Sequence, residues 1–145
     1  MPGCAAIVLL LVGSVLPASE PASELKKHAD AAQGGERAKL CMEYAHQELE
    51  AADVLFTQGE VEKAQATVRE SVAYAHKAAD AAVSSGKHLK QTEIDLRKLA
   101  KRMHDIGETL NFEDRGPVRQ AVDEIEQVRT DLLNRMFGLK PDGKS

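Results

Sequence analysis

The sequence predicts an all-α protein, and three observations support this prediction. Aromatic residues make up only 3% of the 145 residues and Trp is absent, so a core must be built from Ala, Leu, Val, Ile and Met. Such side chains suit closely packed helices better than a β-sandwich. No proline interrupts the chain from Ala22 to Gly116, which permits long helices. Apolar residues recur at helical spacing, and no segment alternates with period two for long enough to be a strand.

The overall composition indicates one globular domain. The hydrophobic fraction of 43% and the charged fraction of 29% are typical of a folded rather than a disordered chain. The formal net charge is −4, which gives no overall attraction to nucleic acid or to an anionic membrane. We therefore expect no nucleic-acid partner.

The N-terminus predicts a secretory signal peptide over residues 1–18. Residues 5–16 form an apolar run (AAIVLLLVGSVL) that is shorter than the roughly 20 residues of a membrane-spanning helix. Pro17, Ala18 and Ser19 then supply a helix break and small residues, so we expect cleavage near Ala18. No Lys or Arg precedes the run, which departs from the usual pattern. We expect a periplasmic or secreted protein with no integral membrane segment after signal cleavage.

The two cysteines have different expected fates. Cys4 precedes the apolar run and would leave with the signal peptide. Cys41 would then be alone in the mature chain, where it can form no intramolecular disulfide. A lone thiol outside the cytoplasm is usually buried and occasionally pairs with a second chain.

The mature chain divides into a leader, a helical domain and a tail. Residues 19–35 are polar and Ala-rich, and suit either a short helix from about Ser23 to Ala32, ended by Gly34 and Gly35, or a mobile leader. Residues 36–138 form the expected helical domain, and residues 139–145 a flexible tail. Within the domain, the apolar spacing predicts four amphipathic helices at 36–58, 60–84, 87–110 and 117–137.

The third of these helices has the clearest pattern. Its apolar residues follow a 3.5-residue repeat, in which one Thr occupies an apolar position, and this is typical of a helix packed nearly parallel to its neighbours. Four such helices joined by short turns predict an antiparallel four-helix bundle. An array of helical hairpins is the alternative arrangement. The repeat consists of Leu89, Thr92, Leu96, Leu99, Met103, Ile106 and Leu110.

Residues 45–76 resemble a tetratricopeptide repeat, a helical hairpin with small residues where its two helices cross. Ala52, Leu55, Gly59, Ala64 and Val68 stand at matching intervals. The chain departs from the family pattern at two positions and shows no second copy at the 34-residue period. The resemblance implies a protein-binding helical scaffold. An ordinary helical hairpin with an Ala-rich contact explains the same residues. The departures are Ser71, in place of the second small Ala, and His76, in place of proline.

A Glu-x-x-His step at Glu43 and His46 is the main candidate for metal binding. In ferritin-like bundles this spacing directs a carboxylate and an imidazole toward one metal, but such sites need a second Glu-x-x-His and two further glutamates. No other His of this chain has Glu three residues before it. A b-type haem between Met103 and His46 or His76 is conceivable, although Met103 belongs to the regular apolar repeat. Zinc needs four ligands, and the mature chain would offer only one thiol, Cys41. We therefore predict no metal and no cofactor.

No catalytic motif stands out. The sequence has neither Gly-x-Ser-x-Gly nor a Cys-His signature, and the Ser-Ser-Gly-Lys at residues 84–87 lacks the upstream Gly of a phosphate-binding loop. We predict that the protein is not an enzyme.

The charge pattern indicates a possible interaction surface on the third helix. Residues 43–62 carry six acidic residues and no Lys or Arg, whereas Lys87 to His104 includes six Lys or Arg and two acidic residues. The opposition can help set which helices lie side by side, although exposed ion pairs contribute only ~0.2–1 kcal/mol each. A solvated face and a partner-facing stripe both explain the basic residues. The candidate surface residues are Lys90, Arg97, Lys98, Lys101, Ile94 and Tyr74.

These observations lead to one principal hypothesis for function. We expect a non-catalytic extracytoplasmic helical module that binds another protein or itself. The alternative is a metal- or haem-binding helical bundle that uses Glu43, His46, Cys41 and Met103. A third possibility is an enzyme whose site would be a deep pocket lined by several titratable groups.

Overall fold

The computed structural model describes residues 21–139, so the expected signal peptide, its cleavage site and residues 140–145 of the expected tail lie outside the described residues. Over residues 21–139 the chain forms helices and no strand, which confirms the all-α prediction. The elements are α1 (Ala22–Ala31), α2 (Gly34–Thr57), α3 (Val61–Ser85), α4 (Leu89–Thr109), the short 3-10 helix η1 (Phe112–Asp114) and α5 (Arg115–Met136).

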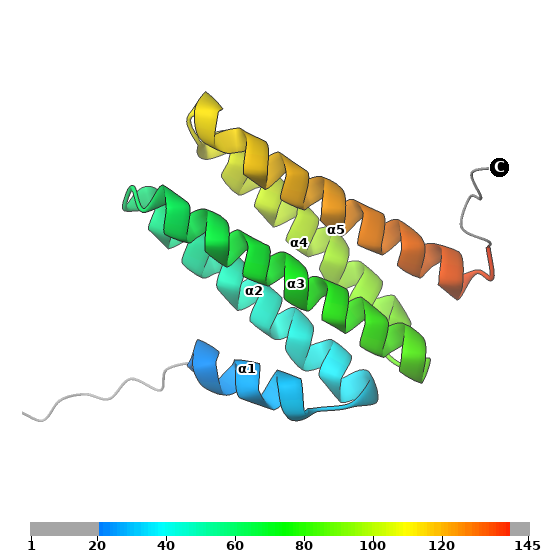
Figure 1. Cartoon of the computed structure of the whole chain (residues 1–145). Helices are drawn as coiled ribbons and strands as arrows, with labels where there is room; N and C mark the ends of the chain where they lie inside the picture. Colours follow the sequence, from blue (N-terminus) through cyan, green and yellow to red (C-terminus); the bar gives the residue numbers. More distant parts are fainter. Residues whose placement is uncertain (1–20, 140–145) are drawn as a thin grey trace, which may run out of the picture.

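The four long helices pack as two antiparallel hairpins laid side by side (Figure 1). The first hairpin is α2 with α3, and the second is α4 with α5. Helix α2 lies beside α4 and α3 beside α5, so neighbours from different hairpins run in the same direction. Helix α1 packs on the first hairpin, on the side away from the second.

The segment predicted as a leader forms part of the packed domain. We expected either a short helix or a mobile leader, and the structure shows the short helix, α1. One of its faces is packed on the domain, because Leu25 and Ala29 are buried. The packed domain therefore begins at α1 rather than at residue 36. Gly34 and Gly35 do not end this helix as expected, since both belong to the first turn of α2.

The first hairpin is built on small residues at seven-residue spacing. Each of its helices presents a line of fully buried Ala or Ser, so the two backbones can approach closely. The hydroxyl of Ser71 shows this approach, because it donates a buried hydrogen bond of 2.7 Å to the backbone carbonyl of Ala45 on the facing helix. The lines are Ala38, Ala45 and Ala52 on α2, and Ala64, Ser71 and Ala78 on α3.

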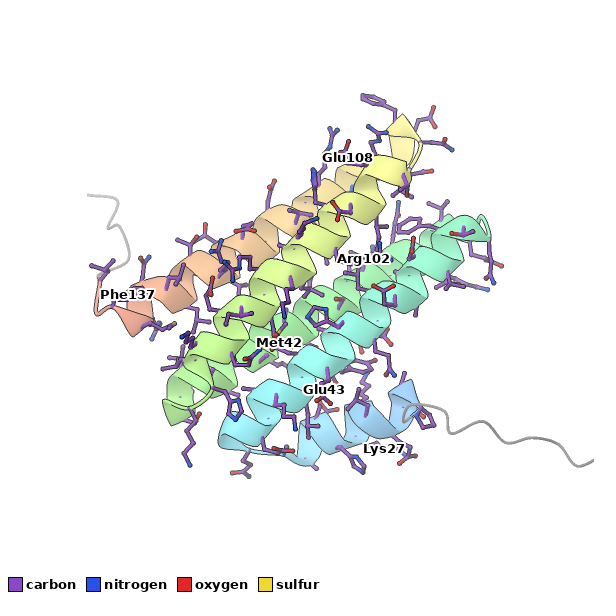
Figure 2. All side chains as sticks on the ribbon, turned by 180° about the vertical axis from the view of Figure 1, so that it is seen from behind. Lys27, Met42, Glu43, Arg102, Glu108 and Phe137 are labelled. Carbon is purple, nitrogen blue, oxygen red and sulfur yellow. The ribbon has the colours of Figure 1, made fainter. Side chains whose placement is uncertain are left out.

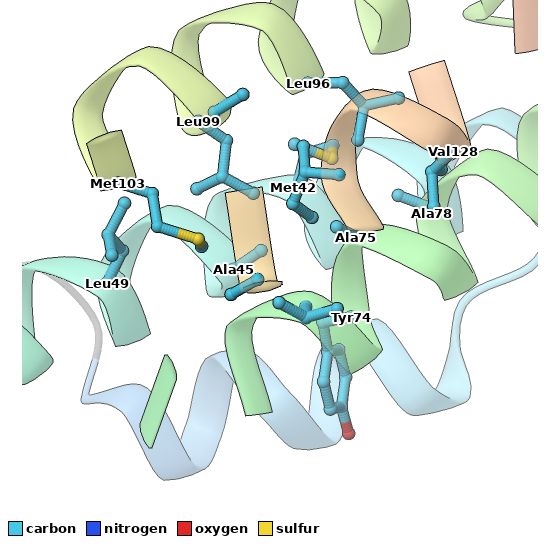
Figure 3. Close-up of a cluster of buried hydrophobic side chains, with 14 of the residues drawn as sticks. Met42, Ala45, Leu49, Tyr74, Ala75, Ala78, Leu96, Leu99, Met103 and Val128 are labelled. Atoms are coloured by element: carbon cyan, nitrogen blue, oxygen red, sulfur yellow. The ribbon is translucent and has the colours of Figure 1, made fainter. Parts of the chain in front are cut away.

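The second hairpin supplies most of the large side chains of the core (Figure 3). The predicted repeat of α4 is buried from Thr92 to Ile106, and its ends, Leu89 and Leu110, are partly buried. Figure 3 shows Leu99 and Met103 of α4 pointing toward α2, where they meet side chains such as Leu49. On α5 the buried large residues are Val118, Ile125, Val128 and Leu132.

Candidate functional site

Most of the predicted interaction surface lies on the exposed side of α4, and we call this part the α4 basic face. We define it as Lys90, Ile94, Arg97, Lys98 and Lys101. The four cations are exposed and Ile94 is half-buried. Residues 90, 94, 97 and 101 follow one another at spacings of 4, 3 and 4, which places them along one line of the helix. The face is therefore a cationic stripe with one aliphatic side chain within it.

Ion pairs divide the cations of α4 into two groups. The ammonium of Lys101 lies 2.9 Å from the carboxylate of Asp105, one turn later, and this hydrogen bond lowers the pKa of Asp105. No ion pair within the described part of the chain involves Lys90, Arg97 or Lys98. These three cations keep their charge available to a ligand or partner.

Arg102, on the side of α4 that meets α2, joins the two hairpins (Figure 2). Its guanidinium donates to the carboxylates of Glu50 at 2.8 Å and Asp53 at 2.9 Å. The hydrogen bond from Arg102 lowers the pKa of Glu50. The acidic stretch of α2 and the basic stretch of α4 thus lie side by side, as their opposite charges suggested.

Tyr74 does not belong to this surface, and its prediction as an exposed contact residue is wrong. Only 2% of Tyr74 is exposed. Its hydroxyl donates to the carboxylate of Asp30 on α1 at 2.8 Å, and its ring meets that of Tyr44 edge to face at 4.4 Å between centroids. Burial, with the bond to Asp30, raises the pKa of the Tyr74 hydroxyl. This role could not be predicted from the sequence, because the docking of α1 had been left open.

Glu43 and His46 line one groove between α1, α2 and α4, with a volume of about 650 Å³. Leu25 of α1 and Met42 of α2 contribute apolar side chains to it, and His88 and Asp95 contribute further polar groups. Burial lowers the pKa of His46, which favours the neutral imidazole. Between residues 21 and 139, no group of three or more His, Cys, Asp or Glu side chains is placed to hold a metal ion.

The other residues considered for metal or haem binding lie apart from this groove. Met103 and Cys41 are each 0% exposed and belong to the core. Burial raises the pKa of the Cys41 thiol, which opposes formation of the thiolate that metals bind. His76 is exposed on α3, with its Nε2 atom 3.9 Å from the carboxylate of Glu124 on α5. The structure therefore does not gather the sequence candidates into one site.

A second groove, between α3 and α5, was not anticipated from the sequence. It has a volume of about 400 Å³, and its lining includes Val68 and Val72 of α3 and Val118 and Ala121 of α5. These four side chains are almost fully buried. The groove runs between two helices of different hairpins that point in the same direction. Its polar lining includes Gln65, Arg69, His76, Gln120 and Glu124.

Comparison with protein-family models, with curated proteins and with solved structures found no match. None of the helices between residues 21 and 139 combines the length and the hydropathy needed to cross a membrane.

Proposed function

We propose that this protein is a non-catalytic, extracytoplasmic interaction module that binds an acidic segment of another protein through the α4 basic face. The observation that supports the proposal is the exposure of Lys90, Arg97 and Lys98 outside any ion pair of the described chain, whereas Arg102 of the same helix is engaged by α2. The extracytoplasmic location rests on the apolar run at residues 5–16 and on the small residues that follow it.

The contact between α2 and α4 illustrates how such a partner would dock. There an acidic helix lies along a basic one, with Arg102 bound to two carboxylates. The α4 basic face offers a comparable row of cations to solvent, and Ile94 adds a small apolar contact. Opposite charges accelerate association and select among partners more than they raise affinity. We therefore expect a salt-sensitive, transient complex.

Charge reversal on the face tests the proposal. The test variant is Arg97→Glu/Lys98→Glu. The matched control, Lys63→Glu/Arg119→Glu, makes the same change in net charge at exposed sites of α3 and α5. Proteins captured by each form from an envelope extract would be identified, and their affinities measured with purified partner at low and at physiological salt. We expect the test variant to lose at least about tenfold in affinity, the equivalent of roughly 1.4 kcal/mol, and the control to retain wild-type binding.

Two outcomes would count against the proposal. One is a partner that binds the test variant as tightly as the wild type. The other is a protein that is strictly monomeric by gel filtration with light scattering and captures no partner even at low salt.

The location is tested separately. We expect the protein in the extracytoplasmic fraction, with an N-terminal sequence that begins close to Ser19. A protein recovered from the cytoplasm with residues 1–18 intact would contradict this part of the proposal.

A further inference from the structure

Helix α1 occupies a surface of the first hairpin that is built to receive it. Leu25 and Ala29 are its two buried side chains, 6% and 0% exposed, and both belong to the core cluster that includes Tyr44 and Tyr74. Both tyrosines of the chain therefore meet at this surface, edge to face. Figure 1 shows α1 on the side of the first hairpin away from α4 and α5.

Polar contacts of opposite sign flank these apolar residues. The ammonium of Lys26 on α1 pairs with the carboxylate of Glu70 on α3. Asp30, one turn further along α1, accepts the Tyr74 hydroxyl bond and lies 3.6 Å from the ammonium of Lys77. The ammonium of Lys77 also lies 4.1 Å from the centre of the Tyr74 ring. Helix α1 thus matches the surface in charge as well as in shape.

Helix α1 is a short element that a short connection joins to the rest of the fold. It has 10 residues, which is below the length at which an isolated helix is stable in water. Only Ala32 and Gln33 join it to α2, and the next residue, Gly34, has φ of +61°. The hinge ends there, because a Cβ on Gly35 would lie 2.6 Å from Cδ2 of His88, which shows how tightly the start of α2 packs on the turn before α4.

We propose that α1 exchanges between two copies of this protein, so that each α1 docks on the first hairpin of the other copy. A second copy is the occupant that the structure supports, because its α1 carries the same Leu25, Ala29, Lys26 and Asp30 in the register that the surface accepts. A short hinge between a small helix and a rigid body favours this exchange. The inference concerns a different surface from the α4 basic face and does not depend on the proposed function.

Crosslinking between two differently labelled populations tests the exchange. Both populations carry Cys4→Ser and Cys41→Ala in the full chain, so that the introduced cysteine is the only thiol. One population carries Lys26→Cys and the other Glu70→Cys. They are mixed at high concentration, incubated, and treated with a short bis-maleimide reagent. Because residues 26 and 70 meet only where α1 is docked, a covalent dimer requires α1 of one chain on the hairpin of the other.

The matched control replaces Lys26→Cys with Lys27→Cys. Lys27 belongs to the same helix, but its side chain is 74% exposed and points away from the hairpin (Figure 2). We expect several-fold more covalent dimer from the pair 26 and 70 than from the pair 27 and 70. A single chain with both Lys26→Cys and Glu70→Cys verifies that α1 docks and that the reagent spans the contact.

Hinge length provides a second measurement. An insertion of four Gly or Ser residues after Ala32 relaxes the connection and favours docking of α1 within its own chain, so we expect several-fold less intermolecular crosslink. Equal dimer yields from the test and control pairs, when the single-chain variant crosslinks efficiently, would overturn the proposal. Capture of a different protein by Glu70→Cys in an envelope extract, in place of the dimer, would assign the surface to that protein and would also overturn it.

Discussion

In the α2/α3 hairpin the helices meet along lines of alanine and serine, whereas the α4/α5 hairpin buries mainly leucine, isoleucine, methionine and valine. Small residues let two backbones approach until a side chain of one helix reaches the carbonyl of the other, as Ser71 reaches Ala45. Large residues instead fill the space between helices and contribute mainly through buried apolar area. The two hairpins should therefore respond in opposite ways to a change in side-chain volume.

The largest effect is expected where volume is removed from the second hairpin. Leu99→Ala leaves a cavity at a residue that is 0% exposed and lies in the middle of the core. We expect the free energy of unfolding to fall by about 2–5 kcal/mol, measured by urea denaturation. The control is Val54→Ala at a residue that is 55% exposed, where we expect a change within about 0.5 kcal/mol. Equal losses from the two variants would remove the distinction between core and surface on which the comparison rests.

The opposite substitution probes the first hairpin. Ala45→Leu introduces three carbon atoms where the backbone carbonyl of residue 45 already contacts Ser71. We expect a loss of about 1–3 kcal/mol, because overpacking forces the helices apart. Ala51→Leu, at an exposed position of the same helix, should change stability by no more than about 0.5 kcal/mol. A first hairpin that accepts Leu at residue 45 without loss would show that its helices are not closely packed.

Two glycines of the second hairpin differ in the space around them. A Cβ added at Gly116 meets no atom within 4 Å, whereas one at Gly107 would lie 3.1 Å from Cγ1 of Val118 on α5. We expect Gly116→Ala to stabilise the protein by about 0.4–1 kcal/mol through reduced freedom of the unfolded chain. In Gly107→Ala the close contact of the new Cβ with Val118 should cancel this stabilisation. Thermal unfolding of both variants would measure the difference. An equal gain from both would mean that α4 and α5 can separate at low cost.

The smallest effect is expected at the ion pair that links the hairpins. The pKa of Glu50 is lowered by Arg102, so its contribution to stability is complete above the ordinary pKa of 4.5 and disappears as pH falls through the lowered value. Glu50→Gln should cost less than about 1 kcal/mol at pH 7, because the carboxylate is largely exposed to solvent. The difference from the wild type should vanish in strong acid. A cost that persists there would show that the contact does not depend on charge.

The helices of this protein could be predicted from the sequence because their signals are local. The apolar repeat from Leu89 to Leu110 and the Ala-rich second helix each describe a single helix, and the proline-free stretch permits long helices. The ends of the predicted helices moved by one or two residues, since helix termini depend on a few turn residues such as Gly86 and His88, which both have positive φ. The opposite charges of α2 and α4 even indicated that these helices are neighbours, and the ion pairs of Arg102 agree with this.

The candidate site was predicted less completely. The four cations of α4 were correctly placed on its exposed side, because a helical repeat defines its outer face as well as its inner face. Tyr74 was misplaced, since its burial depends on a separate helix, α1, whose sequence is short and polar. The α3/α5 groove gave no signal, because it arises between helices that are far apart in the chain.

Which segments are helical, and which face of each helix is apolar, could therefore be predicted from spacing within a single helix. The structure adds that α1 folds back on the first hairpin, that the hairpins lie with like-directed helices adjacent, and that grooves form between helices of different hairpins. These features depend on the fit between surfaces far apart in the chain, and no local pattern records that fit.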